Sequence, residues 1–253
     1  MIVETGASAI YYDVWGSGPP LLMIHGGLVD SRSWEEQREL ASELQLVLPD
    51  TRNFGQSSGK LDGLTMGDLA ADVLAVADDA GLESFHLLGF SIGGVIAQTV
   101  ALRHPDRVRS LILVSTRAGG FTPPPSQGGA AEVRAHVERA YSVSFRSRSA
   151  EFLDGYIAMA IENEARGWEE VRASAATAPG IDEMAGLRRP VLVVHARGDG
   201  SIPLEMAEEL AQVIPGAQLE VVENSGHTMQ VERPALFNEL VVSWVKEREG
   251  EVE

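Results

Sequence analysis

The chain has 253 residues, no cysteine and a formal net charge of −17. This length suits one α/β domain with a single core, and the charge opposes binding to nucleic acid or to an anionic membrane surface. Disulfides, cysteine nucleophiles and thiolate metal sites are excluded. The N-terminus lacks a basic segment followed by an apolar one, and no run of about 20 apolar residues occurs. We therefore expect a cytoplasmic protein without nucleic-acid or membrane partners.

Short apolar runs alternate with helical patterns along the chain. An aromatic, β-branched segment, "AIYYDVW", precedes a turn at 16–20 and an apolar run at 21–24. Later runs that are apolar on both faces, as in parallel strands covered by helices, are "QLVLPD", "SFHLLGF", "SLILVST", "PVLVVHA" and "AQLEVVE". The helical patterns are "SWEEQRELASEL", "TMGDLAADVLAVADDAGL", "GGVIAQTVALRHPDRV" and "SIPLEMAEELAQVIPG". The alternation predicts an α/β fold with a mostly parallel sheet.

One region departs from this alternation. Residues 118–130 are rich in proline and glycine, and a long stretch of helical pattern follows without a strand until "PVLVVHA". We predict a small helical cap at 119–184, inserted into a core formed by 1–118 and 185–253. The alternative is a plain linker whose helices pack on the sheet.

Ser91 lies between a predicted buried strand and a predicted helix, in the string "GFSIGG". This is the position of the nucleophile in a G-x-S-x-G elbow. A serine in such a sharp turn has a strained backbone, and Gly89 and Gly93 would let the neighbouring chain pass close by. The alternative is a helix N-cap without chemistry. We predict that Ser91 is a nucleophile at the carboxyl end of its strand.

A serine nucleophile needs a base, and histidine suits that role near neutral pH. The candidates are His25, His86, His104, His136, His195 and His227. His227 is the best placed, because it follows the last predicted strand on a loop that opens with Asn-Ser-Gly. Asp199 lies between a strand end and the helix near Pro203, where a carboxylate could orient the histidine. An Asx-turn is the alternative role of Asp199. The order Ser91, Asp199, His227 matches the order in α/β-hydrolases.

Acyl transfer also requires donors for the oxyanion of the tetrahedral intermediate. The backbone N–H of Ile92, directly after the serine, is one candidate. The turn "HGGLVDS" offers the second at Gly27, with the neighbouring Leu28 as the alternate. A tight turn without catalytic function is the other interpretation of this glycine pair.

With these motifs the chain resembles the α/β-hydrolase superfamily, in particular its small esterase and lactonase branch. That branch includes 3-oxoadipate enol-lactonases and cofactor-free haloperoxidase-like esterases. The segments that occur in the family's order are "HGG", "DTRNFGQSS", "GFSIGG", "RVRSLILVST", "GLRRPVLVVHARGDGSIP" and "SGHTMQVERP". The resemblance implies an eight-stranded, mostly parallel sheet flanked by helices, with no metal or organic cofactor. Asn53 stands where the family more often has glycine, and asparagine also tolerates left-handed backbone geometry.

Aromatic and methionine side chains near these motifs and in the cap could line an apolar substrate pocket, although the more usual role of each is to pack the cap on the core. They are Trp34, Phe90, Phe145, Phe152, Tyr156, Met159, Trp168 and Met229. Arginines that could bind a substrate carboxylate are Arg52, Arg117 and Arg146.

The combined features predict a serine hydrolase that cleaves a small-molecule carboxylic ester or lactone through an acyl-enzyme. The same triad would support hydrolysis of an activated carbon–carbon bond or perhydrolysis. A non-catalytic ligand receptor on the same fold is the alternative from another class. Homo-oligomerisation is left open by the sequence.

Overall fold

The computed structural model describes residues 1–124 and 128–250 and confirms the α/β class. Its strands lie side by side in the order β1-β2-β4-β3-β6-β7-β8-β9, and β5 pairs with β2 outside this path. The strands are β1 (Ile2–Glu4), β2 (Ser8–Trp15), β3 (Pro20–Ile24), β4 (Gln45–Pro49), β5 (Ser58–Gly59), β6 (Phe85–Phe90), β7 (Val108–Val114), β8 (Val191–Ala196) and β9 (Gln218–Val222). In the described residues the sheet is therefore 9-stranded rather than eight-stranded. The additional strand is the two-residue β5, which carries no apolar run.

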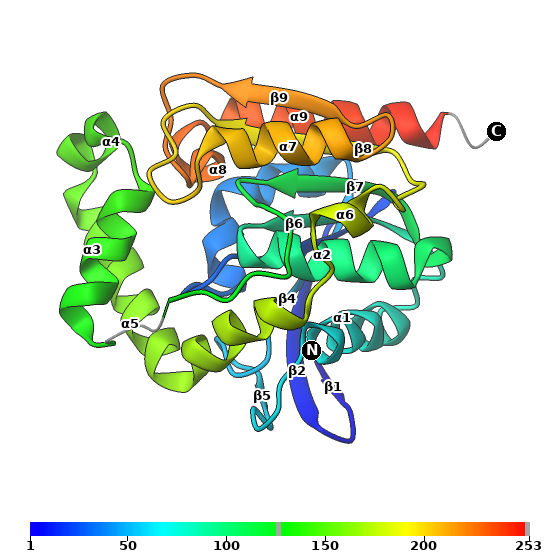
Figure 1. Cartoon of the computed structure of the whole chain (residues 1–253), viewed down its shortest axis with the longest axis horizontal. Helices are drawn as coiled ribbons and strands as arrows, with labels where there is room; N and C mark the ends of the chain where they lie inside the picture. The colour runs from blue at the N-terminus through cyan, green and yellow to red at the C-terminus, as the bar shows by residue number, and fades with distance from the viewer. Residues whose placement is uncertain (125–127, 251–253) are drawn as a thin grey trace.

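The sheet is antiparallel at one edge and parallel in its centre. Both β1 and β4 pair antiparallel with β2, whereas the pairs from β4 through β9 are parallel. The helices between the strands are η1 (Ser31–Ser42), α1 (Met66–Asp79), α2 (Ile92–Arg103), η2 (Pro105–Arg107), α3 (Ala130–Ala140), α4 (Val143–Arg148), α5 (Ala150–Ala173), η3 (Ser174–Thr177), α6 (Ile181–Met184), α7 (Leu204–Val213), α8 (Met229–Glu232) and α9 (Pro234–Glu249). The carboxyl ends of the parallel strands face α3, α4 and α5 (Figure 1).

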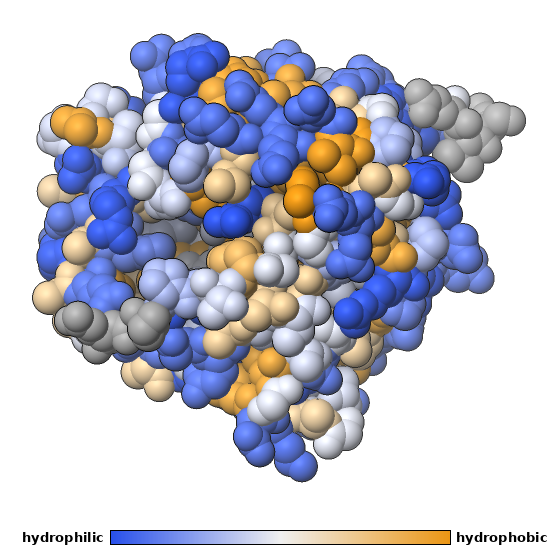
Figure 2. All heavy atoms as spheres, viewed as in Figure 1, coloured by the Kyte–Doolittle hydropathy of each residue, from blue (hydrophilic) through white to orange (hydrophobic). Residues whose placement is uncertain are grey.

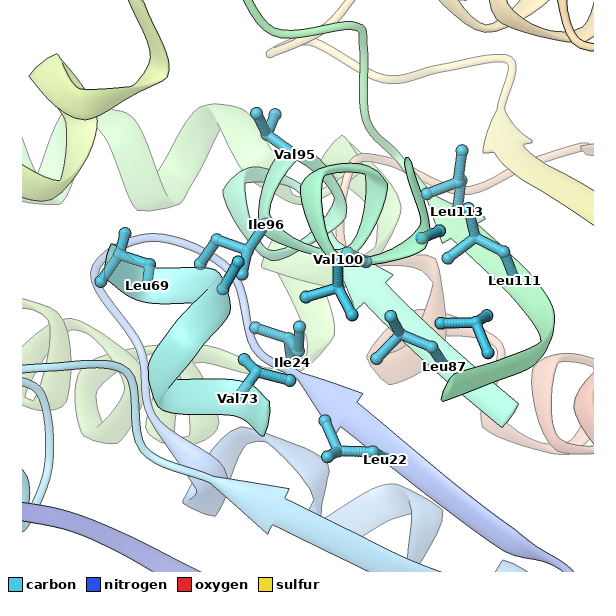
Figure 3. Packing of buried hydrophobic residues seen from close by; sticks show 14 of the residues in the cluster. Leu22, Ile24, Leu69, Val73, Leu87, Val95, Ile96, Val100, Leu111 and Leu113 are labelled. Atoms are coloured by element: carbon cyan, nitrogen blue, oxygen red, sulfur yellow. The ribbon is translucent and has the colours of Figure 1, made fainter. Parts of the chain in front are cut away.

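Apolar layers cover both faces of the sheet. On one face, α1 and α2 pack their apolar sides on the central strands, as Val73 and Val100 do over Leu22 and Leu87 (Figure 3). On the other face, η1 and α9 cover the alternate side chains of the same strands, including Leu21 and Met23. Double-sided burial explains why these strands are apolar along their whole length.

The predicted cap region divides into two parts at Gly167, which interrupts α5 with φ 153°. A Cβ at Gly167 would lie 2.8 Å from Cδ1 of Leu61, so the bend is also a close approach. Before this bend, α3, α4 and α5 share a separate apolar cluster that includes Val137 and Tyr156. After it, Val171 joins the main core cluster. The predicted range 119–184 thus contains residues that pack with the sheet layer as well as residues that lie over the strand ends.

Hydrophilic residues cover most of the face shown in Figure 2, and hydrophobic residues form separate patches there. None of the helices in the described ranges is long and apolar enough to cross a membrane.

Candidate active site

Ser91 occupies the sharp turn between β6 and α2, with φ 55° and ψ −120°. Its N–H donates to the carbonyl of Val114 (2.9 Å), and its own carbonyl accepts from Oγ1 of Thr116 (2.7 Å). A Cβ at Gly89 would overlap the backbone of Gly93, and one at Gly93 would overlap the backbone of His25. Both glycines are therefore required, because neighbouring chain segments pass too close for a Cβ atom. The hydrogen bonds from the N–H and to the carbonyl of Ser91 fix its strained backbone conformation.

A hydrogen-bonded chain joins Ser91, His227 and Asp199. The Oγ atom of Ser91 lies 3.1 Å from Nε2 of His227, and Nδ1 of His227 lies 2.7 Å from Oδ2 of Asp199. The side chains of His227 and Asp199 are only 6% and 1% exposed. Because an ionised carboxylate can only accept, Nδ1 carries the proton and Nε2 is left as an acceptor for the serine hydroxyl. The arrangement suits proton transfer from Ser91 to His227.

The loop after β8 fixes the carboxylate of Asp199. Oδ1 accepts from the N–H groups of Ser201 (2.7 Å) and Ile202 (2.9 Å). Burial alone would raise the pKa of Asp199, but the hydrogen bond and charge of His227 and these N–H groups outweigh it, so the pKa lies below its ordinary value. The carboxylate consequently stays ionised at neutral pH. His195 supports the same loop by donating from Nε2 to the carbonyl of Ile202 (3.0 Å), and burial lowers the pKa of His195.

The turn after β3 brings Gly27 next to the serine. Leu28 has φ 67°, and a Cβ at Gly26 would lie 2.6 Å from the ring of Phe90. His25 is fully buried and accepts from the N–H of Thr51 (2.8 Å), which anchors the turn to the loop after β4. Within the described ranges, no residue accepts a hydrogen bond from the N–H of Gly27 or of Ile92. Both N–H groups are thus available for an anionic oxygen.

Two chambers meet at Ser91, and Trp168 lines both. The larger chamber has a volume of about 420 Å³ and extends along Thr116, Arg117 and Ile202. The smaller has about 50 Å³ and is lined by Gly27 and His227, among others. A small organic molecule could therefore reach the serine hydroxyl from the larger chamber, with one group in the smaller one.

The structure distributes the predicted pocket residues over several locations. Phe90, Tyr156 and Trp168 line the chambers at Ser91. Phe152 and Met159 line a different groove, about 330 Å³, between the cap and η1. The remaining predicted pocket residues pack in apolar clusters away from the chambers: Trp34 and Met229 in the core and Phe145 against Tyr141 in the cap.

The three arginines predicted to bind a substrate carboxylate also lie in different parts of the structure. Arg52 forms a buried ion pair with Asp72 (2.8 Å), and Arg146 lies on α4 outside the chambers. Only Arg117 of the predicted carboxylate ligands lines the larger chamber.

Sequence reasoning named His136 only as one of six candidate bases and did not predict its place on α3, where it lines both chambers. Burial, together with the neighbouring charge of His227, lowers the pKa of His136 to about 4, so the imidazole is neutral at physiological pH. No motif surrounds His136, and only the packing of the cap reveals its position. Among the described residues, no cluster of His, Asp and Glu side chains could hold a metal ion.

Known proteins match the chain over nearly its whole length. The pattern of the α/β hydrolase fold family matches residues 19–136 and 135–234. The 2-hydroxymuconate semialdehyde hydrolase of Pseudomonas sp. (strain CF600) is 32% identical over 278 residues, with 98% of this chain and 94% of that protein covered. The enol-lactonase from Burkholderia xenovorans LB400 has a TM-score of 0.90 at 22% identity, covering 97% of this chain and 100% of that one. A thermophilic esterase from Thermogutta terrifontis has a TM-score of 0.89 at 25% identity, covering 98% of both.

These matches confirm the predicted resemblance to α/β-hydrolases, esterases among them, and support a hydrolytic enzyme. The chain belongs to the α/β hydrolase family.

Proposed function

We propose that this protein is a serine hydrolase that cleaves a carboxylic ester or lactone through an acyl-enzyme intermediate. The observation that carries the proposal is the hydrogen-bonded chain from Asp199 through His227 to Ser91, which ends at a cavity. The names of the esterase and enol-lactonase with the same fold support this reaction class.

In the first step, His227 accepts the proton of Ser91 while Oγ attacks the carbonyl carbon. The N–H groups of Gly27 and Ile92 bind the oxyanion, at the positive end of α2. When the carbon–oxygen bond to the alcohol breaks, His227 returns its proton to the leaving oxygen. Water then attacks the acyl-enzyme with His227 as base, which releases the acid and restores the Ser91 hydroxyl. Throughout, Asp199 orients the imidazole and stabilises its cation.

The test is hydrolysis of a series of short to long acyl esters by the wild type and by Ser91→Ala. We expect the variant to lose at least about 10³-fold in kcat/KM, because Oγ of Ser91 is the hydroxyl oxygen that contacts Nε2 of His227. Ser147→Ala is the matched control, since this hydroxyl is exposed on α4 and donates only to the carbonyl of Ser144. Circular dichroism checks that each variant is folded.

Labelling by a fluorophosphonate, with the modified peptide identified by mass spectrometry, separates the enzyme from a receptor. A hydrolase is labelled at Ser91, and Ser91→Ala is not. An unlabelled, folded wild type that also leaves all esters intact would contradict the proposal.

Hydrolysis of an activated carbon–carbon bond is a second candidate, favoured by the relative named 2-hydroxymuconate semialdehyde hydrolase. The same Ser91 and His227 atoms would serve that reaction. Turnover of 2-hydroxymuconate semialdehyde, with the ester series unreacted, would favour it over ester hydrolysis.

A further inference from the structure

The two chambers at Ser91 differ in size and in chemistry. The smaller chamber, about 50 Å³, is lined mainly by apolar atoms of Leu28, Phe90 and Tyr156, together with His227. The larger, about 420 Å³, is lined by apolar side chains and also by charged ones, including Arg117 and Arg139. The two parts of a substrate would therefore meet different surroundings.

The position of His227 indicates which part of the substrate occupies which chamber. This step rests on the proposed function. His227 must donate its proton to the leaving oxygen, and it lines the smaller chamber but not the larger one. The leaving alcohol consequently occupies the smaller chamber, whose volume suits a one- or two-carbon group. The acyl part then extends into the larger chamber.

Arg117 is a charged residue of the larger chamber, and in the sequence it comes directly after a residue that is hydrogen-bonded to Ser91. It comes after Thr116, whose Oγ1 donates to the carbonyl of Ser91 (2.7 Å). The guanidinium carbon of Arg117 lies 4.2 Å from the centroid of the Phe121 ring, so a cation–π contact with this ring restrains the guanidinium group. The side chain is thus positioned at the chamber beside the serine.

The guanidinium of Arg117 has no anionic partner among the described residues. No carboxylate lies within ion-pair distance of it, and its buried Nε has no acceptor. In contrast, Arg172, which lines the same chamber, is paired with Glu169 (2.7 Å). Arg139, on the same chamber, also forms no ion pair with a described residue, so two cations of this chamber lack a carboxylate partner there. Arg117 is partly buried, and its buried Nε requires an acceptor that the described residues do not supply; the partner of Arg117 is therefore expected to come from a ligand.

The other polar groups of the larger chamber agree with an anionic ligand. Arg139 adds a second positive charge, and the hydroxyl of Ser201 is buried without a partner. Glu132 lines the same chamber. Three arginines of the lining outweigh its negative charge, so the charged lining is net positive.

We propose that the cavity selects an acyl group with a second carboxylate, which Arg117 binds in the larger chamber, while the smaller chamber limits the leaving alcohol. The substrate class is a half-ester of a dicarboxylic acid with a small alcohol. Hydrolysis of such an ester releases the dicarboxylate and the alcohol.

The experiment compares matched pairs of methyl esters with and without a terminal carboxylate, such as monomethyl adipate and methyl hexanoate, over a series of chain lengths. For the wild type, we expect kcat/KM to be about 10- to 100-fold higher for the half-ester of the best length, the range for a hydrogen-bonded charged pair. Arg117→Gln should remove this preference, and Arg117→Lys should restore part of it. In each variant, the quantity compared is the ratio of kcat/KM for the half-ester to kcat/KM for its neutral partner.

Arg188→Gln is the matched control, because this arginine is exposed and donates only to backbone carbonyls outside the chambers. Binding of adipate to the Ser91→Ala protein, measured by calorimetry, tests the chamber without turnover. We expect Arg117→Gln to weaken this binding to the same extent.

Equal kcat/KM for half-esters and neutral esters in the wild type, unchanged by Arg117→Gln, would overturn the inference and leave the proposed hydrolase intact. If no ester is cleaved, the proposed function fails, and adipate binding still decides whether Arg117 holds a carboxylate. Benzyl half-esters that react as fast as methyl half-esters would contradict the assignment of the smaller chamber to the alcohol.

Discussion

The core wall and the cap wall of the site are built differently. On the core side, Ser91, Asp199 and the turn at Gly27 lie on loops at strand ends, and backbone hydrogen bonds or close glycine contacts hold each of them. On the cap side, His136 and Trp168 reach the chambers from α3 and α5, and apolar packing dominates. The difference teaches that the core fixes the positions of the hydrogen-bonded side chains, whereas the cap shapes the space around them. Substitutions in the two walls should accordingly have different effects on activity and on stability.

The largest effect in this comparison is expected for Asp199→Asn. The N–H groups of Ser201 and Ile202 require an oxygen acceptor at the Oδ1 position, so the new amide NH₂ would face Nδ1 of His227. The imidazole would then carry its proton on Nε2 and could not accept the proton of Ser91. We expect kcat to fall about 10³- to 10⁴-fold with little change in KM.

The control for this variant is Asp62→Asn, which changes an exposed aspartate far along the chain from the loop after β8. Steady-state kinetics on one ester and a thermal unfolding curve are measured for both. If Asp199→Asn retains more than about a tenth of the wild-type kcat, the carboxylate of Asp199 does not set the protonation of His227.

A smaller effect is expected where the two walls touch, at Gly27. A Cβ there would overlap the indole ring of Trp168, and since Gly27 does not have a positive φ, alanine suits its backbone. Gly27→Ala should therefore displace either the turn or the cap tryptophan, and we expect kcat/KM to fall about 10- to 100-fold, as for a misplaced oxyanion donor.

The double variant Gly27→Ala, Trp168→Ala sharpens this prediction, with Trp168→Ala alone as its reference. If the overlap is the cause, alanine at position 27 should cost far less activity once the indole is absent. An equal loss in both backgrounds would mean that the glycine is needed for the turn itself and not for the approach of the cap.

The sequence predicted the core wall much better than the cap wall. The strand-to-helix turn at Ser91 and the strand-end loops of Asp199 and His227 have local signals, because apolar runs, glycine spacing and loop residues are all encoded within a few positions. The division of α5 at Gly167 and the place of His136 have no such signal. They depend on how helices far apart in the sequence pack on each other, which is also why Trp34 and Met229 lie in the core rather than at a pocket.

His136→Gln is expected to have the smallest effect, and it concerns stability. The pKa of His136 is lowered from 6.5 to about 4 by burial and by the charges of His227, Arg139 and Arg172, which outweigh the opposing charge of Glu132. Between these pKa values the unfolded chain binds a proton that the folded chain does not, so the free energy of unfolding decreases as the pH falls from about 6.5 to about 4.

Glutamine does not titrate, so His136→Gln should lose less stability than the wild type between pH 7 and pH 5. We expect a difference of about 1 kcal/mol, which is below the full linkage value because the imidazole is part-exposed to solvent in the chambers. Urea unfolding at both pH values measures this difference.

His25, His86 and His195 also have lowered pKa values, and their contribution cancels in the comparison. His104→Gln, which changes an exposed histidine, should behave as the wild type. An identical pH dependence in His136→Gln and the wild type would mean that the imidazole is solvated at the open side of the cap, in which case the cap wall would not enclose the chambers at α3.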